Sequence, residues 1–486
     1  MKLSALCAAA GLDPVGTDEN VTGFAIDHRK VAPGTVFGAF RGARFNGEDF
    51  IAAAVEAGAV AIVAHPEARV AGAVHLADAE PRRLFARLAT PFFAPVPETI
   101  VAVTGTNGKT STVELTRQLW RMAGERAASI GTLGVTTSDE SVSTGLTTPD
   151  IATFLANLSG LAREGVTHVA YEASSHGLSQ FRSEGPRVVA GAFTNLSRDH
   201  LDYHATMDDY FAAKMRLFDE VVVEGGTAVI WADDPWSERA IGHARGRGLQ
   251  VFTVGTRGEG IRLLGRVPGG LGQKLEIEHA GASRIIELPL IGAYQAANAL
   301  VAAGLVLATG GEAGATFEAM KRLVTVRGRI ERAAITPSGA PVYVDYAHTP
   351  DALEAAIAAL RPHVSGRLIV VFGAGGDRDQ GKRPEMGRVA SAGADLAIVT
   401  DDNPRGEDPA AIRAMVLAGM TSAAVEAGDR RDAIGLAVRE AAAGDIVLIA
   451  GKGHEQGQII GSGENLRVLP FDDVAVARDM AGALGR

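Results

Sequence analysis

The residues with the clearest chemical meaning stand in the segment VAVTGTNGKTST, where an apolar run ends in a glycine-rich turn. A lysine and two hydroxyl residues follow the turn and open a helical pattern. Gly105 and Gly108 would let backbone N–H groups close on phosphate oxygens, Lys109 can reach the outer phosphates, and the Thr110 hydroxyl can hold Mg²⁺. The pattern predicts a phosphate-binding loop for ATP or GTP.

This loop departs from the common form in one respect, since Val103 stands where the first glycine is usual. The alternative interpretation is a tight strand-to-helix turn with an incidental lysine. The strand before it, the helix after it and the Gly-Lys-Thr core favour the phosphate loop.

Further polar residues lie at the ends of apolar strands. Glu172 ends the strand THVAYE, and His200 follows FTN in the turn NLSRDHLDYH. Because functional groups gather at the carboxyl ends of parallel strands, this carboxylate and imidazole could hold a metal beside a triphosphate. The alternative for each is a structural hydrogen bond, and Lys214 in YFAAKMRLF also fits a solvated helix surface.

Composition limits the class of protein. The chain has 486 residues, 47% of them hydrophobic, enough for several cores in about three domains. A net charge of −10 argues against nucleic acid or an anionic membrane as the main partner. The one cysteine, Cys7, excludes an internal disulfide framework, fits a reducing cytoplasm and is expected to pack inside a helix.

Two apolar segments are not expected to enter a membrane. Residues 1–12 are too short for a signal peptide with its cleavage site and read as an N-terminal helix. Residues 288–311 carry no charge, but their glycine and amide residues suit a buried helix better than one facing lipid.

The order of strand and helix patterns predicts an α/β fold with three domains. Residues 1–96 form a smaller α/β domain that ends in a proline-rich linker at Pro91, Pro95 and Pro97. Residues 97–325 alternate apolar strands with helices, which predicts a mostly parallel sheet with an antiparallel addition near 260–290. Residues 326–486 start a second α/β series without a complete dinucleotide motif.

The motifs, taken together, resemble the Mur ligases of peptidoglycan synthesis, and among them the members that add diaminopimelate. They are, in order, GTNGKTS, YEASSHGL, NLSRDHLDYH, YFAAKMRLF, RGRIER, DYAHTPD, GGDRDQGKRPEM, DDNPRGEDP and AGKGHE. The resemblance covers nearly the whole chain. It implies an N-terminal domain for the uridine nucleotide, a central P-loop ATPase domain and a Rossmann-like C-terminal domain for the incoming amino acid.

The reaction that the resemblance implies is ATP-dependent amide formation in the cytoplasm. The γ-carboxylate of UDP-N-acetylmuramoyl-L-alanyl-D-glutamate becomes an acyl phosphate, and the amine of meso-2,6-diaminopimelate then attacks it. A carboxylate acylates poorly until its oxygen becomes a phosphate leaving group, and water must be excluded meanwhile. The partners would be these small molecules, without nucleic acid, and the enzyme is expected to be a monomer.

The resemblance also assigns roles around ATP and Mg²⁺. The catalytic residues would be Lys109, Lys214, His200 and Arg329, with Arg329 stabilising charge on the transferred phosphoryl group. The ATP site would comprise Gly105, Thr106, Asn107, Gly108, Lys109, Thr110, Ser111, Asn298, Asp345 and His348. The metal ligands would be Thr110, Glu172, His200 and Lys214. Lys214 would carry a CO₂-derived carbamate, which turns a cation into an anionic oxygen ligand. Gln295 stands where the family often has Asn.

Two substrate sites follow from the same resemblance. The UDP-sugar dipeptide would contact Ile26, His28, Ala43, Arg44, Phe45, Thr147, Thr148, Ser174, Gln180 and Arg182, although His28 replaces the usual Ser. Diaminopimelate would contact Arg378, Asp402, Asn403, Pro404, Arg405, Gly406, Gly451 and Glu455. Arg405 could form a bidentate pair with the distal carboxylate, which lysine lacks, and would repel a lysine ammonium.

Other classes remain as alternatives. A lysine-adding Mur ligase or a folylpolyglutamate-type ligase is disfavoured by Arg405 and by the N-terminal domain. A regulatory GTPase would need a guanine-reading N-K-x-D segment, and the sequence has none. A non-catalytic nucleotide-binding regulator would be expected to lose Lys109, Glu172 or Lys214.

Overall fold

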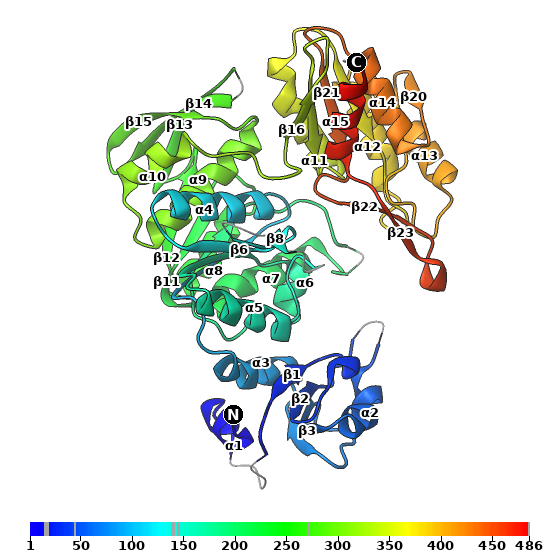
Figure 1. Ribbon diagram of the computed structural model, residues 1–486. Helices are drawn as coiled ribbons and strands as arrows, with labels where there is room; N and C mark the ends of the chain where they lie inside the picture. Colours follow the sequence, from blue (N-terminus) through cyan, green and yellow to red (C-terminus); the bar gives the residue numbers. More distant parts are fainter. Residues whose placement is uncertain are drawn as a thin grey trace.

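The computed structural model describes residues 1–13, 19–42, 45–137, 141–142, 146–201, 203–270 and 272–484. Its strands form sheets of four, eleven and six strands, which follow one another along the chain, and a two-stranded hairpin. Figure 1 shows the first part in blue, the central part in cyan and green, and the last part in yellow to red. The expected α/β class with mostly parallel sheets is confirmed.

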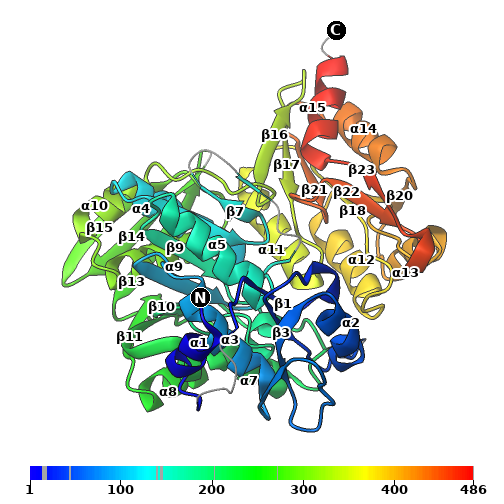
Figure 2. The ribbon, with the colours of Figure 1, turned by 60° about the horizontal axis from the view of Figure 1, so that its bottom comes forward.

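The first sheet is parallel throughout, in the order β1-β2-β3-β4. Its strands are β1 (Gly23–Ala25), β2 (Thr35–Gly38), β3 (Ala59–Ala64) and β4 (Val74–Ala77), and its helices are α1 (Leu3–Ala9), α2 (Ile51–Glu56) and α3 (Pro81–Phe92). Short 3₁₀ turns span His28–Lys30 and Gly47–Phe50. Helix α1 buries Cys7 completely, which confirms its packing role. Both ribbon views place α3 beside the central part (Figures 1 and 2).

The linker prediction is wrong for Pro91, which lies inside the last turn of α3. A proline near the end of a helix removes only one hydrogen bond, and its fixed φ suits the helical backbone. Pro95 and Pro97 do follow the helix, in a stretch without regular structure.

The central sheet has the order β15-β14-β13-β12-β11-β10-β5-β9-β6-β7-β8. Its parallel strands are β5 (Thr99–Thr104), β6 (Ala127–Gly131), β9 (His168–Glu172), β10 (Val188–Phe193), β11 (Val222–Trp231) and β12 (Gln250–Gly255). On one edge, β7 (Gly134–Thr136) and β8 (Ser141–Val142) continue the sheet in antiparallel pairs. On the other edge, β13 (Ile261–Gly269) is parallel to β12, and β14 (Gly272–His279) and β15 (Ala282–Leu288) follow it in antiparallel pairs. The antiparallel addition near 260–290 is thereby confirmed.

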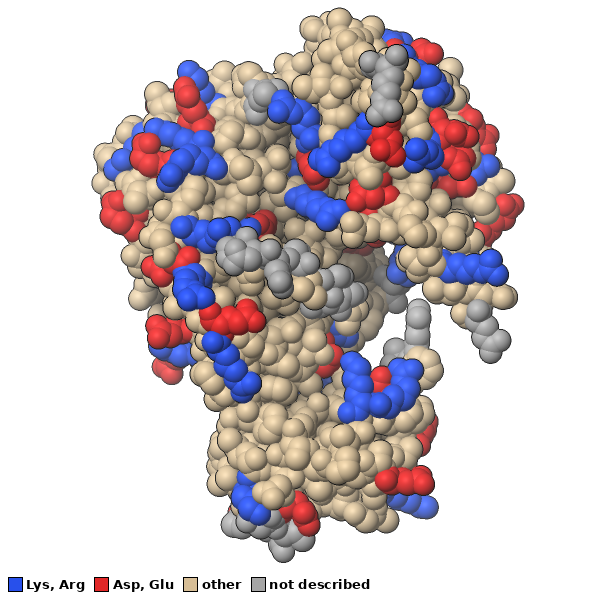
Figure 3. Space-filling view, in the orientation of Figure 1, with Lys and Arg blue, Asp and Glu red and all other residues tan. Residues whose placement is uncertain are grey.

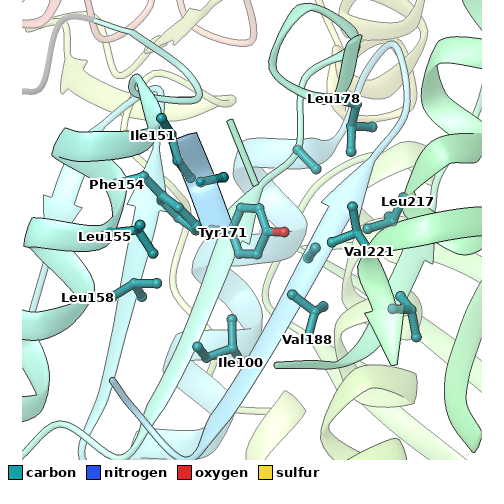
Figure 4. Close-up of a cluster of buried hydrophobic side chains, with 14 of the residues drawn as sticks. Ile100, Ile151, Phe154, Leu155, Leu158, Tyr171, Leu178, Val188, Leu217 and Val221 are labelled. Atoms are coloured by element: carbon teal, nitrogen blue, oxygen red, sulfur yellow. The ribbon is translucent and has the colours of Figure 1, made fainter. Parts of the chain in front are cut away.

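Helices cover both faces of this sheet. They are α4 (Lys109–Met122), α5 (Ile151–Arg163), α6 (Ser175–Ser179), α7 (Met207–Arg216), α8 (Ser237–Gly246), α9 (Ala293–Ala308) and α10 (Ala313–Met320), with a π-helical turn at Leu217–Val221. Figure 4 shows how one face is filled: Phe154 and Leu158 of α5 lie beside Tyr171, Ile100 and Val188 of the strands. Burial of such side chains contributes roughly 1.5–3 kcal/mol each. The uncharged segment forms the buried helix α9, and no helix among the described residues is both long and apolar enough to span a bilayer.

The last sheet has the order β16-β17-β21-β18-β19-β20, with only the edge strand β16 antiparallel. Its strands are β16 (Glu331–Ile335), β17 (Pro341–Asp345), β18 (Leu368–Phe372), β19 (Leu396–Val399), β20 (Ala424–Glu426) and β21 (Ile446–Ala450). Continuous apolar runs such as LIVVF and IVLIA are buried on both faces, as parallel sheets covered by helices require.

The helices of the last part are α11 (Pro350–Leu360), α12 (Lys382–Gly393), α13 (Pro409–Ala418), α14 (Arg430–Glu440) and α15 (Asp473–Leu484), with 3₁₀ turns at Arg361–His363 and Gly463–Asn465. The hairpin pairs β22 (Gly457–Ile460) with β23 (Arg467–Pro470). Arg430 and Asp473 form a fully buried ion pair between the starts of α14 and α15, at 2.7 and 2.8 Å.

The connection between the central and last parts is attached to helix α4. The Gln118 side chain donates to Val324 O at 3.2 Å and accepts from Val324 N at 3.0 Å. Both ends of this side-chain amide therefore hold one residue of the connecting segment.

Candidate functional site

The loop between β5 and α4 requires glycine at two positions. Gly105 has φ +149°, and a Cβ there would lie 1.9 Å from Thr194 Oγ1. Gly108 has φ +86°, and a Cβ there would lie 2.3 Å from Asn298 Oδ1. The predicted strand, tight loop and helix are therefore present, with Thr110 and Ser111 buried in the first turn of α4.

Side chains from the next strand end hold the loop in place. Asn107 N donates to Asn195 Oδ1 at 2.8 Å, and Asn107 O accepts from Thr194 Oγ1 at 2.6 Å. Thr106 Oγ1 donates to Ser197 O at 3.2 Å. These contacts fix the loop backbone in its curved form, which is the arrangement that receives phosphate oxygens.

The Lys109 ammonium lies over its own loop. It donates to Gly105 O at 2.9 Å and to Thr106 O at 2.8 Å. Burial lowers the pKa of Lys109, while the charges of Glu172 and Asp199 raise it. These two carboxylates therefore favour the protonated form of Lys109.

Lys214 reaches the same loop from helix α7 and is only 1% exposed. Its Nζ donates to Gly105 O at 2.7 Å and lies 4.3 Å from the centre of the Tyr210 ring. Burial, and then the charge of Lys109, lower the pKa of Lys214 well below its ordinary value. Lys214 is therefore not on a solvated helix surface, and its amine is chemically distinct from an ordinary lysine.

Glu172 ends β9 and is buried under the loop that follows β6. Its Oε1 accepts from Thr132 N at 2.7 Å, and its Oε2 accepts from Thr132 Oγ1 at 3.2 Å. Thr147 Oγ1 lies 3.1 Å from Thr132 Oγ1. The carboxylate is thus held in one orientation by a hydroxyl network.

His200 has φ +55° in the turn after β10. Its Nε2 lies 3.6 Å from Asp199 Oδ2, and its ring lies edge-on to His176 at 5.0 Å. Burial lowers the pKa of His200 to about 4, and the charges of Lys109 and Lys214 act in the same direction. A neutral imidazole is the form that binds a metal.

The donors present fit Mg²⁺ only in part. The Glu172 carboxylate and Thr110 hydroxyl are hard oxygen ligands, and His200 is neutral. An unmodified Lys214 amine does not suit a hard cation, whereas a carbamate would. Among the described residues no group of three or more His, Cys, Asp and Glu side chains could hold a metal ion alone, so phosphate oxygens would have to complete the coordination.

Arg329 joins this loop from the last part of the chain. Its Nη2 donates to Thr110 Oγ1 at 3.3 Å, and its guanidinium lies 4.6 Å from the centre of the Tyr346 ring. Asp345 accepts from Ile330 N at 2.8 Å, and burial raises the pKa of Asp345 to about 6, against the lowering effect of Arg329. The arginine and the phosphate loop therefore meet across the two parts.

The remaining expected ATP contacts lie around the same point. Asn298 Oδ1 accepts from Thr112 Oγ1 at 3.5 Å, and the buried Asn298 Nδ2 has no partner among the described residues. Gln295 Nε2 donates to Arg329 O at 3.1 Å, so this amide supports the arginine backbone. His348 Nδ1 lies 2.8 Å from Tyr346 O.

The expected dipeptide contacts of the central part form one cluster near α6. Thr148 Oγ1 donates to Glu172 O at 2.7 Å, and Ser174 caps α6 by accepting from the Gly177 N–H. Arg182 donates to Thr148 O at 2.9 Å and to Gln180 Oε1 at 2.7 Å. These side chains share a network with the Glu172 backbone.

The expected uridine contacts lie apart from this cluster, in the first part of the chain. His28 stacks on Phe50 with ring centres 4.3 Å apart, Ile26 is half-buried, and Phe45 is 76% exposed. Outside the described residues lie Ala43 and Arg44. Figure 3 shows the molecular surface hollowed between the first and last parts.

The DNPR segment follows β19 and packs tightly. Asp402, Asn403 and Pro404 are buried. Arg405 has φ +51°; its Nη1 donates to Gly376 O at 2.9 Å and its N–H to Ile459 O at 3.0 Å. The carbonyl oxygen of Gly376 in the neighbouring loop thus fixes the orientation of the Arg405 guanidinium.

Two adjoining loops complete this region. Gly406 N donates to Asp377 Oδ2 at 3.1 Å, and Arg378 Nη1 donates to Asp377 O at 3.2 Å. Gly451 has φ +123°, and a Cβ there would lie 2.5 Å from Asp402 Oδ2. Glu455 Oε2 accepts from Asn403 Nδ2 at 2.9 Å, so the expected amino-acid contacts do come together.

One cavity of about 1730 Å³ is lined by residues of the central and last parts of the chain. Its central-domain wall includes Thr132, Thr147 and His200, and its other wall includes Arg378 and Arg405. A volume of this size exceeds that of a typical single-ligand pocket. It can hold several reactants at once.

Sequence reasoning missed several residues that share these contacts. Lys452 and Lys382 stand inside quoted motifs, AGKGHE and GGDRDQGKRPEM, where their lysines could have been singled out. Lys382 donates to His348 O at 3.0 Å. Asn195 opens the quoted motif NLSRDHLDYH and could also have been singled out, whereas Thr132 lies in a segment without a motif and only the fold reveals its contacts.

Comparison with protein families gives three matches along the chain. Residues 20–89 match the "Mur ligase family, catalytic domain", residues 103–306 the "Mur ligase middle domain", and residues 328–453 the "Mur ligase, glutamate ligase domain".

Curated relatives and solved structures agree with these matches. UDP-N-acetylmuramoyl-L-alanyl-D-glutamate--2,6-diaminopimelate ligase of Zymomonas mobilis is 60% identical over 98% of both chains, and that of Bradyrhizobium diazoefficiens is 51% identical over 97% of both. A solved structure of an enzyme with this name has a TM-score of 0.72 at 33% identity, covering 100% of this chain and 99% of its own. Folylpolyglutamate synthase of Mycobacterium tuberculosis shares the fold alone, with a TM-score of 0.61 at 20% identity over 74% of this chain and 89% of its own. The chain belongs to the Mur ligase family.

Proposed function

We propose that this protein is an ATP-dependent ligase that adds meso-2,6-diaminopimelate to UDP-N-acetylmuramoyl-L-alanyl-D-glutamate in peptidoglycan precursor synthesis. The observation that carries the proposal is a pair of contacts between the central and last parts of the chain. Arg329 donates to Thr110 of the phosphate loop, and Asn403 and Arg405 of the DNPR segment line one cavity with His200. The identity of 60% over nearly the full length with a relative of that name supports the same conclusion.

The first chemical step forms an acyl phosphate. An oxygen of the D-glutamate γ-carboxylate attacks the γ-phosphorus of ATP, and the bond to the β-phosphate oxygen breaks to release ADP. Lys109 and Arg329 stabilise the negative charge that spreads over the transferred group. Mg²⁺, held by Thr110, Glu172, His200 and a carbamylated Lys214, would neutralise phosphate charge when bound.

The second step forms the amide bond. The amine nitrogen of diaminopimelate attacks the acyl carbon, the bond to the phosphate oxygen breaks, and the amine loses a proton. The residues Arg378, Asn403, Arg405 and Glu455 hold the amino acid by its charged groups. Arg405 selects a second carboxylate over an ammonium.

The other contacts in this proposal come from the family resemblance and the clusters described above. The dipeptide nucleotide binds across the central cluster of Thr147, Thr148, Ser174, Gln180 and Arg182 and the uridine-side residues of the first part. The domains span 1–96, 97–325 and 326–486. The enzyme acts as a monomer in the cytoplasm, where ATP and UDP-sugars are available.

The test is an assay of purified protein with ATP, Mg²⁺ and the UDP-muramoyl dipeptide against a panel of amino acids. Phosphate release and the product mass are measured for meso-diaminopimelate, L-lysine, D-alanyl-D-alanine and L-glutamate. Product with diaminopimelate alone supports the proposal. A preference for L-lysine, for L-glutamate on a folate substrate, or no turnover with any of them overturns it.

A further inference from the structure

Lys452 is a completely buried lysine two residues beyond the end of β21, and it directly follows the cavity-lining residue Gly451. Its Nζ donates to Asn403 Oδ1 at 2.8 Å and to Glu455 Oε2 at 3.3 Å, and lies 3.7 Å from Asp402 Oδ1. One ammonium group thus contacts three residues expected to surround the amino-acid substrate. A buried cation persists where carboxylates and hydrogen bonds compensate for its lost hydration.

The first consequence is that the Asn403 amide has a fixed orientation. Its Oδ1 accepts from Lys452 Nζ and from Ile459 N, the latter at 2.9 Å. A flipped amide would place an NH₂ group against both donors. The Nδ2 group therefore faces Glu455, to which it donates at 2.9 Å, and its second N–H is available to a ligand.

The second consequence concerns Glu455, whose side chain is 30% exposed and lines the cavity. Its Oε2 atom accepts from both Asn403 and Lys452. Among the described residues no hydrogen bond reaches Oε1. This oxygen can therefore accept from a ligand ammonium.

We propose that Lys452 is a positioning residue that sets the Asn403 amide and the Glu455 carboxylate for the ammonium and carboxylate of an incoming amino acid. The positive charge of Lys452 also offsets the negative charges of Asp402 and Glu455, so that the site does not attract a substrate with a net positive charge. Lys452 thereby favours a zwitterionic dicarboxylic amino acid over a cationic one such as lysine. This inference rests on the proposed function.

The experiment compares Lys452→Met, which keeps the unbranched side chain up to the ε position and removes the charged ammonium, with Lys274→Met as a matched control. Lys274 lies on β14 with its side chain 65% exposed. The expected result for Lys452→Met is a KM for diaminopimelate raised on the order of 30-fold or more, because a buried charge contact is lost. The KM values for ATP and the UDP-muramoyl dipeptide, and kcat at saturating diaminopimelate, should stay within about threefold. The preference for diaminopimelate over lysine should fall.

A double-mutant cycle separates positioning from a structural role. If Lys452 acts through Glu455, Lys452→Met should add little in a Glu455→Gln background. The inference is overturned if the two substitutions change the KM for diaminopimelate additively. It is also overturned if Lys452→Met raises the KM of every substrate equally or leaves the KM for diaminopimelate unchanged. If Lys452→Met does not fold, Lys452→Arg and Lys452→Gln decide, because the charged variant must keep the lower KM. A wild-type enzyme that does not use diaminopimelate refutes the proposed function instead.

Discussion

Lys109 and Lys214 donate to the same carbonyl oxygen, Gly105 O, at 2.9 and 2.7 Å. Two buried ammonium groups at one acceptor repel each other, and the charge of Lys109 contributes to lowering the pKa of Lys214. Burial and this repulsion together make the unprotonated amine of Lys214 more accessible than that of an exposed lysine. Such an amine is the nucleophile that reacts with CO₂ to form a carbamate, which would replace the repulsion with attraction.

Lys109→Ala should abolish phosphoryl transfer while the fold remains. The ammonium stabilises developing phosphate charge, and loss of one such donor costs on the order of 10²–10³ in kcat. ATP-dependent phosphate release and far-ultraviolet circular dichroism are measured together. The matched control is Lys321→Ala, directly after the end of α10, where the lysine side chain is 37% exposed. Near-normal ligation by Lys109→Ala would refute the assignment of the phosphate loop.

Lys214→Ala should lose most activity, and a small carboxylic acid added in solution should partly restore it by replacing the carbamate. Mass spectrometry under CO₂ and a metal-loaded crystal structure test the modification directly. An unmodified ammonium in an ordered, metal-loaded, active enzyme would contradict it. Lys214→Arg serves as the second variant, because it keeps a cation that cannot be carbamylated and should not respond to CO₂.

Arg405→Ala should lower the efficiency with diaminopimelate roughly 30- to several-thousand-fold, since loss of a charge-assisted contact costs about 2–5 kcal/mol. Uptake of ATP and of the UDP-muramoyl dipeptide should hardly change. Lysine should not become a good substrate, because its ammonium would still lack an acceptor. Competition between meso-diaminopimelate and L-lysine in wild type and variant measures this. Unchanged diaminopimelate efficiency would remove Arg405 from the specificity site.

Asp473→Asn should destabilise the last part of the chain by about 3–5 kcal/mol, because it leaves the buried Arg430 without its charge partner. Asp479→Asn is the matched control: its pair with Arg431 joins the same two helices, with side chains 49% and 64% exposed. An exposed pair contributes at most about 1 kcal/mol. Urea unfolding measures both variants. If both variants lose the same small amount of unfolding free energy, the buried pair is not needed for stability.

His454 should make the folded state less stable at low pH. Burial lowers the pKa of His454 to about 3, whereas an unfolded histidine titrates near 6.5. As pH falls below about 6.5 the unfolded state binds a proton first, so stability is lost at up to about 1.4 kcal/mol per pH unit. His454→Gln should reduce this slope, measured by urea unfolding at pH 5 and 7.5. An identical slope in both proteins would exclude His454 as its source.

The sequence predicted the features that depend on local pattern. Apolar runs predicted the buried strands, the uncharged stretch predicted helix α9, and the Gly-Lys-Thr turn predicted the loop whose glycines have positive φ. The motifs indicated the Mur ligase family, which the comparisons confirmed. The roles of the site residues stay predictions.

Contacts between distant segments could not be predicted in this way. Lys214 and Gly105 are 109 positions apart, and Arg329 and Thr110 are 219 apart, so only the strand order brings them together. Lys452 has the residue type of a solvated side chain, and its burial depends on Asp402 and Asn403 from another loop as well as on Glu455 of its own loop. The position of Pro91 was also not predictable from the sequence. A proline fits a linker, but it also fits the last turn of a helix such as α3.

The attachment of Val324 to Gln118 has a consequence for inhibition. Because the oxygen and the nitrogen of the Gln118 side-chain amide both hold Val324, any bending between the central and last parts would be confined to the few residues after Val324. Residues 324–327 also line the cavity. A compound bound against these residues would restrict movement between the central and last parts without imitating any of the reactants.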